Sequence, residues 1–348
     1  MNSACDQIRD CVPKMRTAPS RSSFLANCIR MLVISGALLL PALAVAQSYP
    51  SKPIRLIIPF PPGGTTDIVG RLIADELGKN LGQSVVIENR GGGGGAIGAA
   101  EVKNAAPDGY TLGVATVSTM AVNPACNPKL PYRSPEDFAP ITNIAAVPNV
   151  IVVNPERVRE TTMADFVKFA RANPGKLSYA SSGTCSINHM MGELFKVASG
   201  TFIVHIPYRG SGPALNDVVG GQVEVLMDNL PSSLPFIQSG KLRPLAVAAP
   251  NRLDVLPEVP TLAELNMAPV NDRAWYGLVA PAGTPPEIVS RVHDAAVKAL
   301  ATATVRDRLK LQGAEPVGNT PEQFLAQILA ERNKMLDLVK RQGIKLEQ

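Results

Sequence analysis

The stretch Pro53-Ile-Arg-Leu-Ile-Ile-Pro-Phe-Pro-Pro-Gly-Gly-Thr-Thr-Asp67 joins a short β-rich run to a loop of prolines and glycines. The residues that follow repeat apolar side chains at the spacing of one helix face: Ile68, Val69, Leu72, Ile73 and Leu77. Together these features predict a strand, a tight loop and an amphipathic helix. In an open α/β sheet, the loop after such a strand lies at the edge where ligands bind.

Short apolar runs and helical patterns alternate along the rest of the chain. Strands are expected at 84–88, 110–117, 149–153, 177–180, 202–206, 223–227, 245–249 and 275–280. Helices are expected at 96–104, 163–172, 187–198, 213–219, 286–301 and 321–342. This alternation predicts the α/β class, with mainly parallel sheets covered by helices on both faces.

The order of these elements predicts two doubly wound lobes. We expect residues 47–145 and 250–348 to form lobe 1, and residues 146–249 to form lobe 2. The chain then crosses between the lobes near residues 145 and 250, and two crossings make a hinge. The carboxyl ends of the strands would border a cleft between the lobes, which is where ligands bind in such sheets.

The first 46 residues have the composition of an export signal. Arginines precede an apolar run from Met31 to Val45, and Ala44-Val-Ala46 fits a signal-peptidase site. The run has about 15 residues and a membrane helix needs about 20, so a cleaved leader is expected rather than an anchor. We expect cleavage after Ala46 and a periplasmic product, with translation beginning at either Met1 or Met15.

The charge of the mature chain bears on its partners, and its two cysteines bear on a disulfide. Removing the leader takes away five basic and two acidic residues, which lowers the formal charge from +5 to +2. No Lys/Arg-rich or basic aromatic stretch remains, so nucleic acid is not expected as a partner. Cys126 follows the third expected strand and Cys185 lies in a loop at the same cleft, so a disulfide is expected in an oxidising compartment.

Two strand-loop-helix junctions have the residues of an anion site. First-turn amides of a helix lack intrahelical acceptors, and the helix dipole adds about half a positive charge. Glycines would let the backbone approach an anion, and hydroxyls would add donors. The candidates are Gly63, Gly64, Thr65, Thr66, Ser181, Ser182, Gly183 and Thr184. Alternatively, Thr66, Asp67 and Ser182 only cap the two helices.

Signatures of enzymes are weak in this sequence. Gly93-x-Gly95-x-x-Gly98 matches a dinucleotide fingerprint within a run of five glycines, but the next strand ends without an acidic residue for a ribose. No P-loop lysine or G-x-S-x-G elbow is present. His189 and Glu193 have no third metal ligand in view, so a hydrogen bond near the loop or simple packing is expected for His189. We expect no cofactor, no metal and no catalysis, and a hydrolase or metalloenzyme on the same fold stays as the alternative.

Seven motifs in one order resemble a known family. They are Tyr49-Pro-Ser-Lys-Pro-Ile-Arg55, Pro59-Phe-Pro-Pro-Gly-Gly-Thr-Thr-Asp67, Val86-Ile-Glu-Asn-Arg-Gly91, Pro107-Asp-Gly-Tyr-Thr-Leu112, Leu130-Pro-Tyr132, Ile206-Pro-Tyr-Arg-Gly210 and Val259-Pro-Thr-Leu-Ala-Glu264. Over nearly all of residues 48–348, the chain resembles the substrate-binding proteins of tripartite tricarboxylate transporters, the Bug (Bordetella uptake gene) family.

The resemblance implies a type II periplasmic binding protein fold, a small carboxylate as ligand, membrane transporter subunits as partner, and a monomer. It implies that the loops Phe60–Asp67 and Ser181–Ser186 hold the ligand carboxylate; Cys185 departs from the family pattern. Ser118, Tyr208, Arg209 and Asp228 are the candidates for the far end of the ligand. Arg209 would suit a second carboxylate, and Asp228 an ammonium or hydroxyl group. Their alternatives are a salt bridge between lobes and a strand-end cap.

Overall fold

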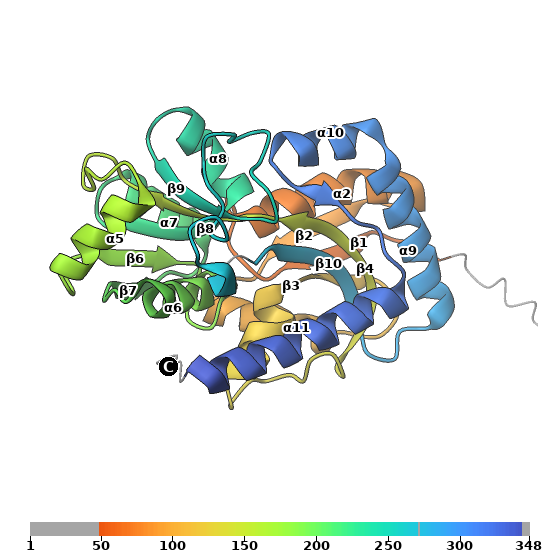
Figure 1. Cartoon of the computed structure of the whole chain (residues 1–348). Helices are drawn as coiled ribbons and strands as arrows, with labels where there is room; N and C mark the ends of the chain where they lie inside the picture. Colours follow the sequence, from red (N-terminus) through yellow and green to blue (C-terminus); the bar gives the residue numbers. More distant parts are fainter. Residues whose placement is uncertain (1–48, 271, 343–348) are drawn as a thin grey trace, which may run out of the picture. The chain divides into compact units, whose positions relative to one another are not determined.

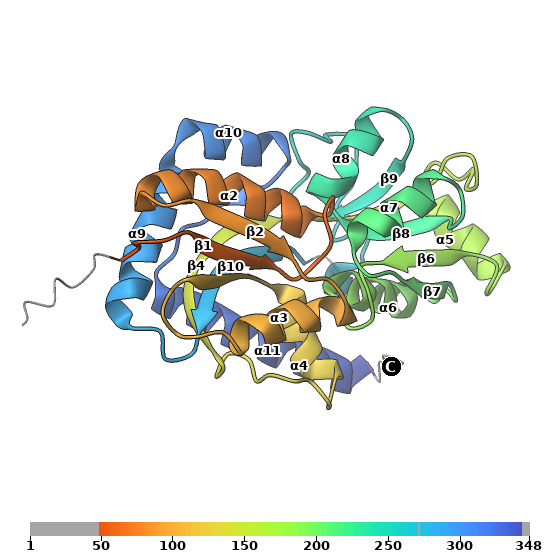
Figure 2. The same ribbon diagram turned by 180° about the vertical axis from the view of Figure 1, so that it is seen from behind.

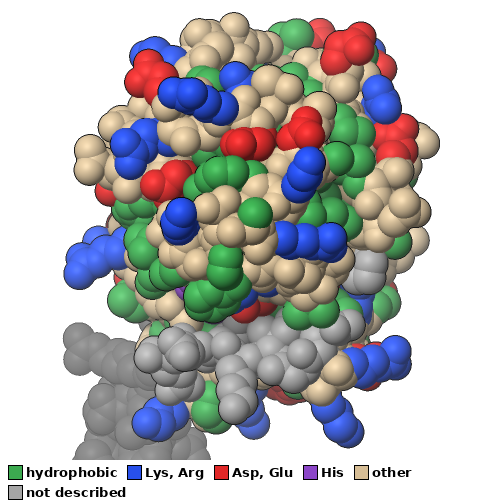
Figure 3. Space-filling view, turned by 60° about the vertical axis from the view of Figure 1, so that its left-hand side comes forward, with side chains coloured by type: hydrophobic (Ala, Val, Ile, Leu, Met, Phe, Trp, Pro, Cys, Tyr) green, Lys and Arg blue, Asp and Glu red, His purple; other side chains and the backbone are tan. Residues whose placement is uncertain are grey.

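The computed structural model describes residues 49–270 and 272–342, so the expected leader, residues 1–46, lies outside this part. Among the described residues, no helix is both long and apolar enough to cross a membrane. Lys and Arg side chains are interspersed with Asp and Glu over the face shown in Figure 3, so this face carries no continuous basic patch.

The first lobe contains a six-stranded sheet in the order β11-β4-β10-β3-β1-β2. Its strands are β1 (Ile54–Ile58), β2 (Val85–Asn89), β3 (Thr111–Thr116), β4 (Phe138–Val147), β10 (Ala274–Pro281) and β11 (Glu315–Pro316). One side is covered by α2 (Thr65–Leu81), α9 (Pro286–Ala301) and α10 (Ala303–Leu311) (Figures 1 and 2). The other side is covered by α3 (Ala96–Lys103), α4 (Asn123–Cys126) and α11 (Pro321–Gln342).

The second lobe contains a five-stranded sheet in the order β7-β6-β8-β5-β9. Its strands are β5 (Asn149–Val153), β6 (Ser178–Ser181), β7 (Val204–Pro207), β8 (Val225–Asn229) and β9 (Arg243–Ala248). Helices α5 (Met163–Ala172) and α6 (Ile187–Ser199) lie on one side, and α7 (Ser211–Val219) and α8 (Leu230–Gln238) on the other (Figure 1). Both lobes therefore have the helix-covered sheets that the alternating pattern predicted.

Strand β5 shows why the sequence of a central strand is an unbroken apolar run. Val150 and Val152 pack in the core beneath α7 and α8, whereas Ile151 and Val153 pack in the core on the opposite face. Successive side chains of a strand point to opposite faces, so a strand covered on both sides needs apolar residues at every position. The predicted strand at 149–153 is confirmed for this reason.

The sheets are mixed rather than mainly parallel, which corrects the sequence-based expectation. β10 runs antiparallel to β3 and β4, and β5 runs antiparallel to β8 and β9. β4 leads directly into β5 through Pro148, so the first crossing lies close to the expected residue 145. Each sheet thus contains one strand that enters from the other lobe and runs antiparallel to both of its neighbours.

The second crossing lies later than residue 250. Leu262 donates its backbone N–H to the carbonyl of Val247 in β9, and Thr261 forms a bridge with the same strand. The 3₁₀ turn η3 (Ala268–Val270) packs against α6, and the chain returns to the first sheet only at β10. Residues 250–270 therefore belong with the second lobe, because the proline-rich connector lies along its sheet before it returns.

Several elements were not predicted from the sequence. β4 begins as Phe-Ala-Pro, and α8 contains Pro231 and Pro235, so prolines mask both patterns. Helix α10 was also missed, since its mean hydropathy is low and its buried face consists mainly of Val305 and Leu309. None of these elements changes the α/β class.

A disulfide connects the two lobes. Cys126 ends α4 in the first lobe, Cys185 precedes α6 in the second, and their Cα atoms are 6.2 Å apart. Cys185 adopts a positive φ of 60°, which is uncommon for a residue with a Cβ. The bond therefore fixes the second loop against the first lobe beside the cleft.

Replacing both cysteines by serine should lower the free energy of unfolding by about 2 to 4 kcal/mol, because the bond closes a long loop in the unfolded chain. The sequence separation is 59 residues. Urea denaturation of the mature protein measures the loss, and wild type with reductant should lose a similar amount. Two free thiols in the unfolded, non-reduced wild type would contradict the pairing.

Candidate functional site

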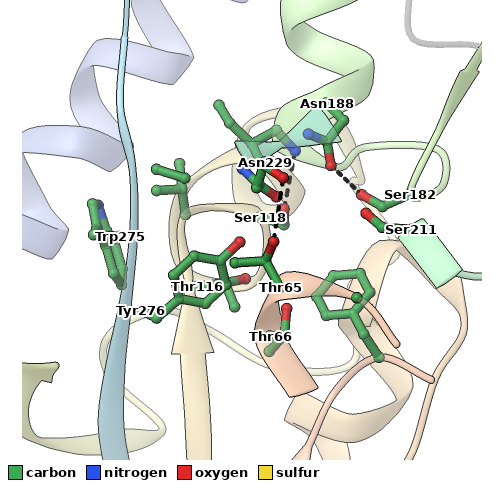
Figure 4. Close-up of a pocket in the computed structure, with 15 residues that line it drawn as sticks. Thr65, Thr66, Thr116, Ser118, Ser182, Asn188, Ser211, Asn229, Trp275 and Tyr276 are labelled. Atoms are coloured by element: carbon green, nitrogen blue, oxygen red, sulfur yellow. Dashed lines mark hydrogen bonds between the residues drawn. The ribbon is translucent and has the colours of Figure 1, made fainter. Parts of the chain in front are cut away.

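A small cavity lies between the lobes at the carboxyl ends of the strands (Figure 4). Its volume is about 10 Å³, which is room for about one water molecule, so the lobes are closed on each other. The lining residues carry no charged side chain: they are Phe60, Gly64, Thr65, Thr66, Thr116, Val117, Ser118, Ser182, Ile187, Asn188, Ser211, Asn229, Ala274, Trp275 and Tyr276. Both lobes contribute, so the site is complete only in the closed form.

The first wall of the cavity is the amino-terminal end of α2. Gly64 is the N-cap residue, and no side chain accepts a hydrogen bond from the first turn. The amides of Thr65 and Thr66 belong to that turn and have no acceptor within the helix. Neither Thr66 nor Asp67 caps α2, so the alternative of simple capping is wrong for this helix. The helix end is left open toward the cavity.

Asp67 braces this loop from behind. Its carboxylate accepts hydrogen bonds from the backbone N–H of Gly63, the guanidinium of Arg71 and the side-chain amide of Asn89. Burial acts to raise the pKa of Asp67, but these hydrogen bonds outweigh it and hold the pKa below its usual value. Asp67 stays ionised and fixes the glycine turn, and it does not line the cavity.

The second wall is the amino-terminal end of α6. Ser186 is its N-cap residue and accepts from the N–H of His189. Ser182 is not the cap: its hydroxyl donates to Oδ1 of Asn188 at 2.6 Å, as Figure 4 shows. Among the described residues, Nδ2 of Asn188 has no hydrogen-bond partner although the side chain is only 1% exposed. A buried donor without a partner is costly, so this atom marks a position for an acceptor in the ligand.

A buried cluster of two histidines supports the second loop. Nε2 of His205 lies 2.7 Å from the hydroxyl of Ser181, and Nδ1 of His189 accepts from the N–H of Cys185 at 3.2 Å. The two imidazoles are stacked with their centroids 3.7 Å apart. His189 thus lies near the loop without lining the cavity, and no group of three His, Cys, Asp or Glu among the described residues could hold a metal ion.

Both histidines are neutral at pH 7. Burial lowers the pKa of His189 to about 4, with a smaller effect of Lys196. Burial also lowers the pKa of His205 to about 3, and the adjacent His189 adds to this effect. Neutral rings can accept hydrogen bonds from the loop, whereas a protonated ring could not.

Close contacts between the lobes surround the cavity. The N–H of Ile187 donates to the hydroxyl of Ser118 at 2.9 Å, and the hydroxyls of Thr65 and Ser232 lie 2.8 Å apart. Gly94 packs against the second loop: a Cβ at this position would lie 2.4 Å from the carbonyl oxygen of Thr184. The glycine run at 91–95 therefore provides close approach between lobes, and no nucleotide is needed to explain it.

The structure brings together only part of the predicted site. Of the candidates, Phe60, Gly64, Thr65, Thr66, Ser118 and Ser182 line the cavity. Gly63, Asp67, Ser181, Gly183, Thr184 and His189 lie in or beside the two loops and do not line the cavity. The two loops border the cavity, and residues of β3, β8 and β10 also line it.

The three candidates Tyr208, Arg209 and Asp228 do not line this cavity. Arg209 is exposed, and a Cβ placed on Gly91 of the first lobe would lie 3.4 Å from the carbonyl oxygen of Arg209. The hydroxyl of Tyr208 donates to Asp217 on α7 at 2.6 Å. Asp228 is fully buried beneath serines of its own lobe.

Several lining residues were missed. They are Thr116, Val117, Ile187, Asn188, Ser211, Asn229, Ala274, Trp275 and Tyr276. Thr116 ends β3 and Asn229 ends β8, so the rule that sites lie at strand ends could have found them. Tyr276 lies in the antiparallel strand β10, whose position in the first sheet no local pattern indicates.

Two mixed α/β lobes, two crossings of the chain and a polar cavity closed between two helix ends define a two-lobed solute-binding protein. The family is then identified by comparison. The chain belongs to the tripartite tricarboxylate transporter receptor family, because the model described as "Tripartite tricarboxylate transporter family receptor" matches residues 69–344.

Individual relatives agree with this assignment. Protein BugT of Bordetella pertussis is 37% identical over 326 residues, which cover 92% of this chain and 100% of BugT. A solved structure described as that of a periplasmic transporter is 54% identical, has a TM-score of 0.85, and covers 86% of this chain and 100% of its own. The structure of R. palustris Rpa4515 with adipate is 37% identical, has a TM-score of 0.82, and covers 85% and 99%. The resemblance, the fold and the solute-binding function expected from the motifs are confirmed.

Gly94→Ala should disfavour the closed form, and Gly82→Ala is its matched control. Both glycines have positive φ, so each variant should lose about 1 to 2 kcal/mol of stability from backbone strain. Only the Cβ at position 94 meets the other lobe, since nothing lies within 4 Å of one at position 82. Small-angle scattering in reductant, which releases the disulfide, should show a larger radius of gyration for Gly94→Ala alone. Equal radii would contradict the closing role of Gly94.

Lowering the pH from 6.5 to 4.5 should destabilise the protein. The unfolded chain binds protons at His189 and His205 near their ordinary pKa, whereas the folded chain does not until lower pH, so the free energy of unfolding falls as pH falls. Each proton contributes at most about 1.4 kcal/mol per pH unit. In urea titrations His205→Gln should show a shallower dependence of the free energy of unfolding on pH than wild type. Identical slopes for the two proteins would contradict the role of the buried pair.

Proposed function

We propose that this protein captures a small carboxylate-bearing solute in the cavity between its lobes and delivers it, chemically unchanged, to the membrane subunits of a tripartite transporter. The observation that carries the proposal is a set of unpaired donors from both lobes in a cavity without charged side chains. The donors are the first-turn amides of Thr65 and Thr66 and the side-chain amide of Asn188.

A carboxylate suits these donors for electrostatic reasons. Its two oxygens accept several hydrogen bonds, and the dipoles of α2 and α6 both favour negative charge at their amino-terminal ends. Hydrogen bonds to a charged acceptor are roughly twice as strong as those between neutral groups. The adipate bound by the relative Rpa4515 supports the same ligand class.

Binding would be coupled to closure of the lobes. Thr65 and Thr66 belong to the first lobe and Asn188 to the second, so an open form offers the ligand only half of its partners. A ligand that binds the closed form better shifts the equilibrium toward it. The transporter subunits would then recognise the closed, loaded protein.

Export to the periplasm as a monomer, with the leader cleaved after Ala46, completes the proposal. The apolar run before Ala46 and the periplasmic setting of the 54% identical structure support it. Gln47 would be the first residue of the exported chain.

A hydrolase is disfavoured by the site itself. Ser181 and His205 form a serine-histidine pair at 2.7 Å, but Ser181 is fully buried and lies behind the loop, away from the cavity. A nucleophile must reach its substrate, so this pair serves to brace the loop.

Asn188→Leu should weaken carboxylate binding by about tenfold to a hundredfold, because it removes a buried hydrogen bond to a charged group while keeping the side-chain volume. The ligand is first identified by native mass spectrometry of the protein purified from periplasm, and its affinity is then measured by calorimetry. Asn216→Leu, on the exposed side of α7, is the control and should bind as wild type does. Unchanged affinity in Asn188→Leu, or a co-purified compound that is consumed on incubation, would contradict the proposal.

A further inference from the structure

Asp228 lies directly behind the wall that the second lobe contributes to the cavity. It is in β8, and its side chain is 0% exposed. Three hydroxyls donate to its carboxylate: Ser211 at 2.6 Å, Ser232 at 2.7 Å and Ser233 at 2.7 Å. All four residues belong to the second lobe, so the cluster persists when the lobes separate.

The hydrogen bonds of Asp228 match those of an ionised carboxylate. The backbone N–H of Asn229 is a fourth donor, and a carboxylate accepts about four hydrogen bonds while donating none. Burial raises the pKa of Asp228, and this effect outweighs the opposing effect of the four donors. Among the described residues, no Lys, Arg or His forms an ion pair with it. The three serine hydroxyls are therefore all directed to Asp228 beneath the wall.

Ser211 lies between Asp228 and the cavity. A serine hydroxyl has one hydrogen, and that of Ser211 is directed to Asp228, so Oγ can offer only lone pairs to a ligand. Ser211 lines the cavity, as does Ser182 of the same lobe (Figure 4). A Cβ placed on Gly64 would be 3.3 Å from Cβ of Ser211, so this acceptor lies next to the open end of α2.

We propose that Ser211, oriented by Asp228, selects a ligand that carries a hydrogen-bond donor, a hydroxyl or ammonium, on the carbon next to its carboxylate and that it rejects a second carboxylate there. The ligand class is a 2-hydroxy or 2-amino carboxylate. This inference rests on the proposed function, which places the first carboxylate at the amides of Thr65 and Thr66.

A second carboxylate at this position would meet two penalties. It has no hydrogen to give to the lone pairs of Ser211, and its charge would lie near the buried carboxyl group of Asp228 with no cation in the lining. Arg209, the basic residue expected to meet a second carboxylate, is exposed and outside the cavity. A hydroxyl or ammonium donates to Ser211 and meets neither penalty.

Four acids with one carbon chain test the inference: 2-hydroxyhexanoate, 2-aminohexanoate, hexanoate and butylmalonate, which differ only at the carbon next to the carboxylate. Calorimetry on the mature wild-type protein, stripped of ligand by unfolding and refolding, should rank the two donor-bearing acids above hexanoate by about tenfold and butylmalonate last. Adipate is included as a general carboxylate probe.

The outcomes separate this inference from the proposed function. Butylmalonate binding as tightly as 2-hydroxyhexanoate would overturn the inference and leave carboxylate capture intact. Failure of all five acids, together with a co-purified compound that lacks a carboxylate, would overturn both. A co-purified carboxylate with no donor next to the carboxylate would overturn the inference alone.

Two variants assign the selectivity to the named residues. Ser211→Ala should lower the ratio of affinities for 2-hydroxyhexanoate over hexanoate by about tenfold, since the acceptor is lost. Asp228→Asn should lower the preference for 2-hydroxyhexanoate over butylmalonate by a similar factor. Asp217→Asn removes a carboxylate from the same lobe away from the cavity and should preserve both ratios. Ratios unchanged in Ser211→Ala would overturn the assignment even if Asp228→Asn failed to fold.

Discussion

The open amino-terminal end of α2 is the constraint on which the site depends. Glycine at the N-cap position gives the amides of Thr65 and Thr66 no side-chain acceptor, and no charged residue lines the cavity that they face. Amides left unpaired in a closed cavity are costly. The second lobe adds Asn188, whose Nδ2 also has no hydrogen-bond partner among the described residues. Donors from both lobes therefore favour an anion in the closed cavity. A ligand that satisfies these donors stabilises the closed form.

The second loop is held rigidly because it carries half of this arrangement. Ser181 and Cys185 are hydrogen-bonded to the neutral, stacked pair His205 and His189, and Cys185 is also bonded covalently to the first lobe. Gly94 allows the backbone of the first lobe to approach Thr184. The protein therefore orders this loop before the ligand binds, so that ligand binding loses less conformational entropy.

Charge is distributed so that the ligand never meets a full positive charge. Asp228, behind the second-lobe wall, is hydrogen-bonded by hydroxyls and not paired with a cation among the described residues, and the hydrogen of Ser211 is directed to it. Asp67 is ionised behind the first wall and stabilises the glycine turn. Backbone dipoles and hydroxyl orientation thus replace ion pairs, which makes recognition depend on the direction of each hydrogen.

The sequence by itself determined the α/β class, most strands and helices, and the two loops, because apolar period, glycines and helix starts are local signals. It also paired Cys126 with Cys185. Only the tertiary structure decided that β5 and β10 run antiparallel, that the connector stays on the second lobe, and that Arg209 points to solvent. It alone brought Asn188, Ser211 and Tyr276 to one cavity. These depend on contacts between segments far apart in the chain, and on the direction of single hydroxyls, which no local pattern encodes.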